Sequence, residues 1–97
     1  MGDAIRDFQI VSQTVMAGVE KEMTIPCDIN YMELVLITTA NADGRLAWEQ
    51  GETGNGGKYL PISLDYWTPT NTMLPSGKKF YLRSAINNTF KIKYGKR

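Results

Sequence analysis

The 97-residue chain has no histidine and a single cysteine, Cys27. Without histidine it lacks the commonest general base and the Ser/His and Cys/His pairs that activate nucleophiles. One cysteine cannot form an intrachain disulfide, and without histidines beside it there is no ligand set for structural zinc. The composition therefore favours a binding or structural role over catalysis, and it predicts no metal and no cofactor.

Long hydrophobic runs are also missing, since no stretch approaches the roughly 18–20 apolar residues of a membrane span. The N-terminus lacks the basic-then-apolar order of a signal peptide, so we expect a soluble protein that is not exported. Hydrophobic residues make up 42% and charged residues 22%, which are ordinary values for a globular protein. At this length the chain can form one modest core, so residues 1–97 are predicted to be a single domain with residues 1–7 as an N-terminal arm.

Acidic side chains are absent from the last third of the chain. Residues 1–65 hold all ten acidic residues and only four basic ones, a net charge of −6. Residues 66–97 hold seven basic residues and no acid, a net charge of +7. Such a division indicates either an arm that binds nucleic acid or a subunit whose basic face meets an acidic neighbour.

Apolar residues recur at every second position rather than with helical spacing. In the clearest segment Phe90, Ile92 and Tyr94 alternate with Lys91 and Lys93, which is typical of a strand buried on one face. The other β-type segments are Phe8–Val15, Met23–Cys27, Tyr31–Thr39, Arg45–Gln50, Leu60–Trp67 and Lys79–Arg83.

Glycine, proline, asparagine and aspartate separate these segments, as turns require. Seven or eight short strands at 8–14-residue spacing predict an all-β fold, an antiparallel β-sandwich of jelly-roll type. Segment 31–39 is apolar on both faces apart from Glu33, which predicts a central strand covered on both sides. Pro61 predicts a strand at a sheet edge, and Asn87-Asn88 a two-residue hairpin turn.

The sequence offers only weak candidates for a ligand-binding loop or a pair of catalytic residues. Glycine-rich segment 51–57 lacks the Gly-Lys-Ser/Thr ending of a phosphate-binding loop, because Lys58 is followed by Tyr59, so it is predicted to be a flexible hairpin connection. The carboxylates on or near loops, such as Glu52 and Asp65, are better explained as surface charges than as an acid/base pair.

The aromatic residues are more informative. Trp48 and Tyr66 fall on inward positions of the alternation and are predicted to fill the core. Trp67 falls on the opposite face at the start of the proline-containing loop 67–77. Contact with a partner and burial under that loop both remain open for Trp67.

The basic C-terminal strands predict one contact stripe, in which Lys91 and Lys93 are joined by Arg83 and Lys79 and interleaved with Tyr81. Three functions fit such a stripe: a solvated guard against edge aggregation, a protein partner, or a nucleic acid. Nucleic acid is the weakest of these, because the whole protein is nearly neutral with a pI of about 7.8 and carries no RNA-binding signature.

The order of segments resembles the small β-sandwich capsid decoration or cement proteins, and related head-fibre modules, of tailed bacteriophages. The likeness covers most of the chain. Its main features are an N-terminal extension, a β-branched run, Glu22-Met23-Thr24-Ile25-Pro26 leading into the long apolar strand, and the ending Leu74-Pro75-Ser76-Gly77 followed by an aromatic and a final alternating strand.

The resemblance implies a non-enzymatic virion protein, made in the host cytoplasm, that binds the major capsid protein or other virion subunits where capsomers meet and stabilises the particle. It also implies a homotrimer. An extended segment from residues 1–15 is expected to add to a neighbouring sheet through main-chain hydrogen bonds. The residues expected to contact the partner are Trp67, Tyr81, Arg83, Lys91 and Lys93.

Two alternatives stay open. The chain can instead be a glycan-binding module in which Trp67 and Trp48 stack on sugar rings beside Asn55 and Asn71. It can also be another virion part, such as a head–tail connector or a tail component, because β-sandwich modules are reused among these parts.

Overall fold

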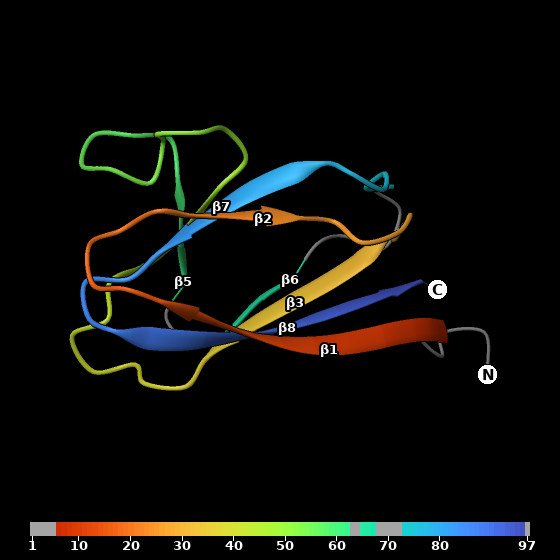
Figure 1. Ribbon diagram of the computed structural model, residues 1–97, viewed down its shortest axis with the longest axis horizontal. Helices are drawn as coiled ribbons and strands as arrows, with labels where there is room; N and C mark the ends of the chain where they lie inside the picture. Colours follow the sequence, from red (N-terminus) through yellow and green to blue (C-terminus); the bar gives the residue numbers. More distant parts are fainter. Residues whose placement is uncertain (1–5, 63–64, 68–72, 97) are drawn as a thin grey trace.

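A computed structural model describes residues 6–62, 65–67 and 73–96, with the backbone alone for residues 6–8 and 65–67. The described residues form strands and no helix (Figure 1). The strands are β1 (Arg6–Val15), β2 (Lys21–Thr24), β3 (Tyr31–Leu36), β4 (Gly44–Ala47), β5 (Leu60–Ile62), β6 (Asp65–Trp67), β7 (Lys79–Arg83) and β8 (Asn88–Lys96).

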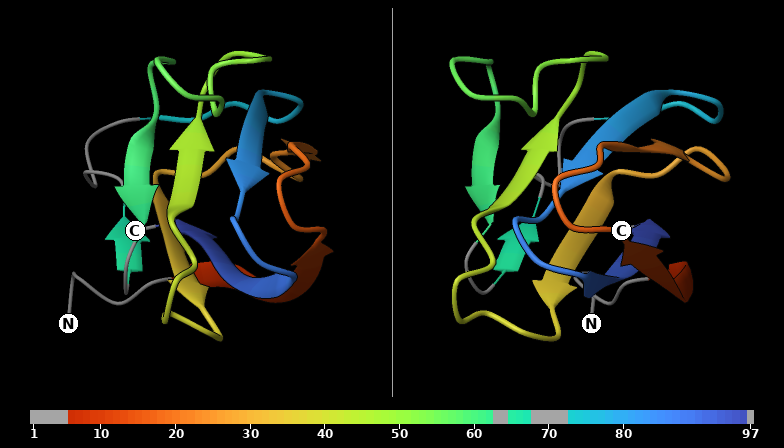
Figure 2. Two further views of the ribbon diagram at one scale, coloured as in Figure 1. Left: turned by 90° about the vertical axis from the view of Figure 1, so that its left-hand side faces the viewer. Right: turned by 60° about the vertical axis from the view of Figure 1, so that its left-hand side comes forward.

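These strands form two four-stranded antiparallel sheets, in the orders β1-β8-β3-β6 and β2-β7-β4-β5. The pairing is nested: the first described strand pairs with the last, the second with the seventh, the third with the sixth and the fourth with the fifth. This is the winding of a jelly roll, in which a long folded ribbon wraps into two layers (Figure 2). The predicted all-β, antiparallel β-sandwich is confirmed.

The core lies between the two layers and follows from the period-two alternation. On β8, Phe90 and Ile92 are fully buried while Lys91 between them is exposed, and on β7 Phe80 and Leu82 are likewise fully buried. Each such side chain stabilises the fold by roughly 1.5–3 kcal/mol through its removal from water. The other large apolar side chains that are fully buried are Val15, Ile25, Ile29, Met32, Leu34, Leu46 and Ile62.

The segment predicted as one strand, Leu60–Trp67, is divided between the sheets. Its first part, β5, lies beside β4 at the edge of one sheet, and its second part, β6, lies beside β3 at the edge of the other. The prediction that Pro61 lies in an edge strand is confirmed, since among the described strands β5 has a neighbour on one side only and needs no donor on the other. Strand β3 lies between β8 and β6, as expected for a central strand.

The hairpin predicted at Asn87-Asn88 is wrong. Strands β7 and β8 lie in different sheets, so the connection crosses between the layers instead of turning back. The Asn88 side chain fixes this crossing: its Oδ1 accepts from the Thr38 backbone N–H at 3.2 Å and its Nδ2 donates to the Thr38 carbonyl at 2.7 Å. A side chain thus supplies the hydrogen bonds that a hairpin would have supplied.

The N-terminal arm predicted over residues 1–7 does not hold for residues 6 and 7, which belong to β1. Arg6 already belongs to β1, where it pairs with Lys96, and a register shift separates it from the regular pairing that begins at Gln9. Residues 1–5 lie outside the described part of the chain.

Candidate functional site

The predicted contact residues do not form one surface. Tyr81 and Arg83 lie on β7, whereas Lys91 and Lys93 lie on β8 in the opposite sheet. The backbone of Trp67 lies in β6, and its side chain lies outside the described part of the structure. The two sheets therefore present two different outer faces, which have to be considered separately.

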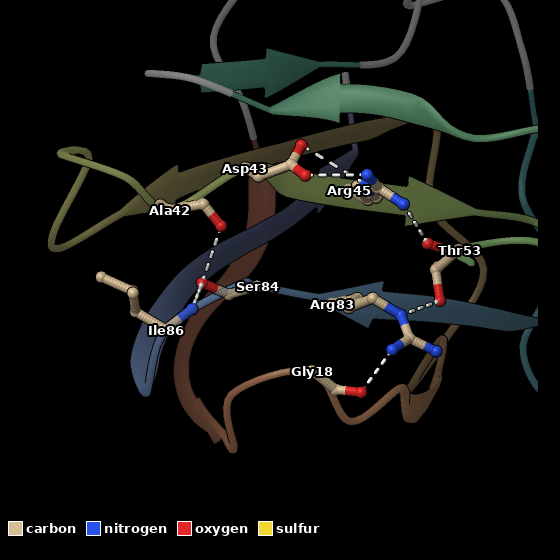
Figure 3. A network of polar contacts seen from close by, with 8 residues as sticks. All are labelled: Gly18, Ala42, Asp43, Arg45, Thr53, Arg83, Ser84 and Ile86. Carbon is tan, nitrogen blue, oxygen red and sulfur yellow. Dashed lines mark hydrogen bonds and ion pairs between the residues drawn. The ribbon is translucent and has the colours of Figure 1, made fainter. Parts of the chain in front are cut away.

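The outer face of the β2-β7-β4-β5 sheet is closed by the chain itself. Arg45 on β4 and Arg83 on β7 are neighbours in register, and the loop 48–59 that joins β4 to β5 returns to them. Its residue Thr53 is fully buried. The Thr53 carbonyl accepts from Arg45 Nη1 at 2.9 Å and its hydroxyl accepts from Arg83 Nε at 3.0 Å (Figure 3). The glycine-rich segment is a hairpin connection as expected, but it is anchored rather than flexible.

A carboxylate completes the anchor. Glu20 Oε1 accepts from the Thr53 hydroxyl at 2.5 Å and from the Thr53 N–H at 3.3 Å, and Oε2 accepts from the Gly51 N–H at 2.9 Å. Burial by itself would raise the pKa of Glu20. The hydrogen bonds from Thr53 and Gly51, with the charge of Arg83, outweigh burial and hold that pKa below its ordinary 4.5.

Arg45 is the best-buried charged group of this face, with 9% of its surface exposed. Its Nη2 donates to Asp43 Oδ2 at 2.7 Å, and its guanidinium carbon lies 4.2 Å from the centre of the Tyr59 ring. The hydrogen bond and charge of Asp43 raise the pKa of Arg45 despite burial. Gly44, the residue before Arg45, lets β4 lie close against β5, because a Cβ there would meet the Ile62 carbonyl oxygen at 2.5 Å.

Tyr81 and Arg83 are both engaged within the chain. Tyr81 is 7% exposed, and its hydroxyl donates to Glu22 Oε1 at 3.4 Å. Burial first, and the neighbouring Glu22 carboxylate second, raise the pKa of Tyr81. Arg83 Nη1 donates to the Gly18 carbonyl (Figure 3). Tyr81 is therefore buried, whereas Arg83 is half-buried and lines a shallow pocket of about 210 Å³ with Arg45 and Gly18. Both side chains are held by contacts within the chain, in contrast to the shared contact surface that the sequence predicts.

The outer face of the β1-β8-β3-β6 sheet differs. Its side chains Ile10, Glu33, Val35, Lys91 and Lys93, here called the open sheet face, line a shallow groove of about 300 Å³. Ile10 is 59% exposed and Val35 39% exposed. The prediction that β3 is covered on both sides is therefore wrong at Val35: within the described residues one face of β3 packs on the core, whereas on the other Tyr31 is buried, Glu33 is half-buried and Val35 is exposed.

Register explains the composition of the open sheet face. Glu33 pairs with Lys93 and Val35 with Lys91 across β3 and β8, so an acid–base pair and an aliphatic–base pair lie side by side. Lys93 Nζ lies 6.0 Å from the centre of the Tyr31 ring. Aliphatic groups with cationic neighbours suit adhesion to an apolar, acidic surface.

Trp48 is partly buried against the core, as predicted. Its ring lies 6.0 Å from the Phe80 ring, and Lys78 Nζ lies 5.3 Å from the Trp48 ring centre. With these contacts it is poorly placed to stack on a sugar. The Tyr66 side chain lies outside the described part of the structure.

Comparisons with known proteins returned no match: no family model, no curated protein and no solved structure resembles the chain closely enough to be reported. Within residues 6–62, 65–67 and 73–96, no three acidic or cysteine side chains gather as metal ligands would. In the same residues, no helix is long and apolar enough to span a membrane.

The sequence interpretation missed Ile10, Glu33 and Val35 as surface residues. A signal for two of these residues was present. Glu33 and Val35 are two positions apart on β3, so the alternation places Val35 on the same face as the charged Glu33. This signal was hidden by the apolar character of the whole segment 31–39, which the pattern alone assigns to burial on both faces.

Proposed function

We propose that this chain is a non-enzymatic structural protein of a virion, a decoration protein that attaches to capsid subunits at capsomer junctions through the open sheet face. The observation that supports an adhesive role is the contrast between the two outer faces. One is closed by the loop around Thr53, whereas the other presents aliphatic side chains to solvent beside two lysines.

The energetics favour a protein partner for this face. Covering Ile10 and Val35 gains about 25 cal/mol for each Å² of apolar surface removed from water. Lys91 and Lys93 add steering and register toward an acidic partner rather than large affinity. The virion assignment itself rests on the resemblance in segment order, and jelly rolls are a common architecture of capsid and lectin domains.

Immunogold electron microscopy with an antibody against the chain tests the virion assignment. It is applied to purified particles from lysates of cells that express the gene. Regular labelling over the capsid shell supports the proposal. Labelling confined to a tail or a connector replaces the decoration role with another virion part, and a chain that stays in the soluble fraction while particles form contradicts the proposal.

The contact surface is tested separately by binding of the purified protein to particles that lack it. We expect the variant Val35→Ser/Lys91→Glu/Lys93→Glu to bind at least about tenfold more weakly, because it removes an apolar contact and reverses two charges. The matched control is Leu60→Ser/Lys21→Glu/Lys58→Glu, which makes the same kinds of change at exposed positions of the other sheet and its loop. Equal binding by the two variants would show that the open sheet face is not the contact surface.

A further inference from the structure

Strand β1 is an unprotected sheet edge. Within the described residues it has a strand neighbour, β8, on one side only. From Gln9 to Val15 its pairing with β8 is continuous, and this stretch contains no charged residue and no proline. Edge strands of this length are usually blunted by such residues, because their free main-chain groups otherwise pair with another chain.

The other edges show those devices. Strand β2 carries Lys21 and Glu22 among its four residues, and β5 carries Pro61 among its three. Strand β6 is three residues long and carries Asp65. β1, with ten residues, is the longest described strand and the edge without such protection along its regular part.

The hydrogen-bond pattern identifies which groups of β1 face outward. The Ile37 N–H donates to the Thr89 carbonyl, so on β8 the odd-numbered residues bond toward β3. Even-numbered residues of β8 then bond toward β1, where their register partners are odd-numbered. The main-chain N–H and C=O groups of Ile10, Ser12 and Thr14 therefore point away from the sheet. The Thr14 carbonyl accepts from the Gln13 side-chain Nε2 at 2.9 Å, an exposed contact that strand pairing would have to replace.

We infer that β1 is the docking site for a second copy of this chain, pairing antiparallel with its own counterpart across a two-fold axis at Ser12. Ser12 is the midpoint of the regular stretch Gln9–Val15, so this register pairs the whole stretch with itself. Ile10 then lies opposite the partner's Thr14, and Ser12 opposite the partner's Ser12, with their outward main-chain groups exchanging hydrogen bonds.

The chemistry of β1 favours its own copy as the occupant. A two-fold axis brings identical residues together, which repels where they are charged, and between Gln9 and Val15 no residue is charged. Ile10 and Thr14 are β-branched residues that pair well across strands, and Ile10, now 59% exposed, becomes partly covered. The two β1-β8-β3-β6 sheets merge into one continuous sheet.

This inference does not depend on the virion assignment. It differs from the homotrimer that the resemblance implies, because pairing across a two-fold axis makes a closed dimer. The oligomeric state of the purified protein therefore decides between the two arrangements, whatever the protein binds.

Light scattering coupled to size-exclusion chromatography gives the first test. We expect the wild-type chain to have twice its monomer mass of 10.9 kDa, and Ser12→Pro to be a monomer. Proline at residue 12 removes an outward N–H and leaves the hydrogen bonds to β8 intact, so the β-type circular dichroism should persist. A wild-type monomer or trimer, or a dimer that survives in folded Ser12→Pro, would overturn the inference.

Cross-linking gives a second test that does not depend on the folding of the proline variant. In a Cys27→Ser background, Ser12→Cys should form a disulfide-linked dimer on air oxidation, since paired Cα atoms about 5.5 Å apart suit a disulfide. The matched control Thr24→Cys places a thiol on the exposed edge strand β2. Equal cross-linking at residues 12 and 24, or none at residue 12, would contradict pairing through β1.

Discussion

The two outer sheet faces of this jelly roll are built from the same alternating pattern and end in opposite states. On the β2-β7-β4-β5 sheet, the outward residues Arg45, Tyr81 and Arg83 are covered or engaged by the chain itself, and only the edge near Glu22 and Lys79 is exposed among the described residues of β2 and β7. On the β1-β8-β3-β6 sheet, the outward positions include Val35 and Lys91, which remain exposed. The difference arises from the loop after β4, whose Thr53 reaches back to the sheet.

The comparison shows that an outward position is not by itself a surface position. A strand pattern specifies on which side of its sheet a residue lies, whereas a loop distant in sequence decides whether that side meets water. Polar side chains on the closed face then contribute to stability, and exposed ones on the open sheet face, such as Lys91, are expected to contribute to association.

The largest expected difference between the faces is in the free energy of unfolding that is lost when a cationic side chain is removed. Arg45→Ala should lower the free energy of unfolding by about 2–3 kcal/mol, because it removes a charged group that is hydrogen-bonded to Asp43 and Thr53 in a buried setting. Lys91→Ala, the counterpart on the open sheet face, should change it by less than about 0.5 kcal/mol. Urea denaturation measures both, and similar losses would remove the distinction between the faces.

A smaller effect on the stability of the fold is expected when the pH is lowered. Because the folded-state pKa of Glu20 lies below its ordinary 4.5, the ionised carboxylate stabilises the fold above that value, and this stabilisation is lost as pH falls through the lowered pKa. Glu20→Gln should therefore be less stable than the wild type at pH 7, and the difference should shrink at acidic pH.

The control for this experiment is Glu49→Gln, the same change at an exposed carboxylate. Urea denaturation at neutral and acidic pH gives the free energies of unfolding of all three proteins. A wild-type advantage over Glu20→Gln that stays constant with pH would show that the carboxylate does not act through its charge.

Much of the fold could be predicted because it depends on local alternation. The positions of Phe80, Leu82, Phe90 and Ile92 follow from period two alone, and all four are fully buried. Pro61 marked an edge strand because the lack of an N–H is a property of the residue itself. The sandwich class follows from many such short, separate signals.

The topology and the site depend on contacts between distant residues, which the pattern does not contain. Asn87-Asn88 has the composition of a hairpin turn, but the Asn88 side chain bonds to Thr38, fifty residues away, and the chain crosses to the other sheet. Arg83 and Lys91 are both cations on alternating strands. Only the sheet order shows that they face opposite sides of the molecule.

Hydroxyl-radical footprinting of the protein, free and bound to the capsid particle, tests the open sheet face most directly. We expect binding to protect Val35, Lys91 and Lys93, while labelling of loop 48–59 on the closed face stays unchanged. Protection of that loop with unchanged labelling of Val35 and the two lysines would contradict this expectation.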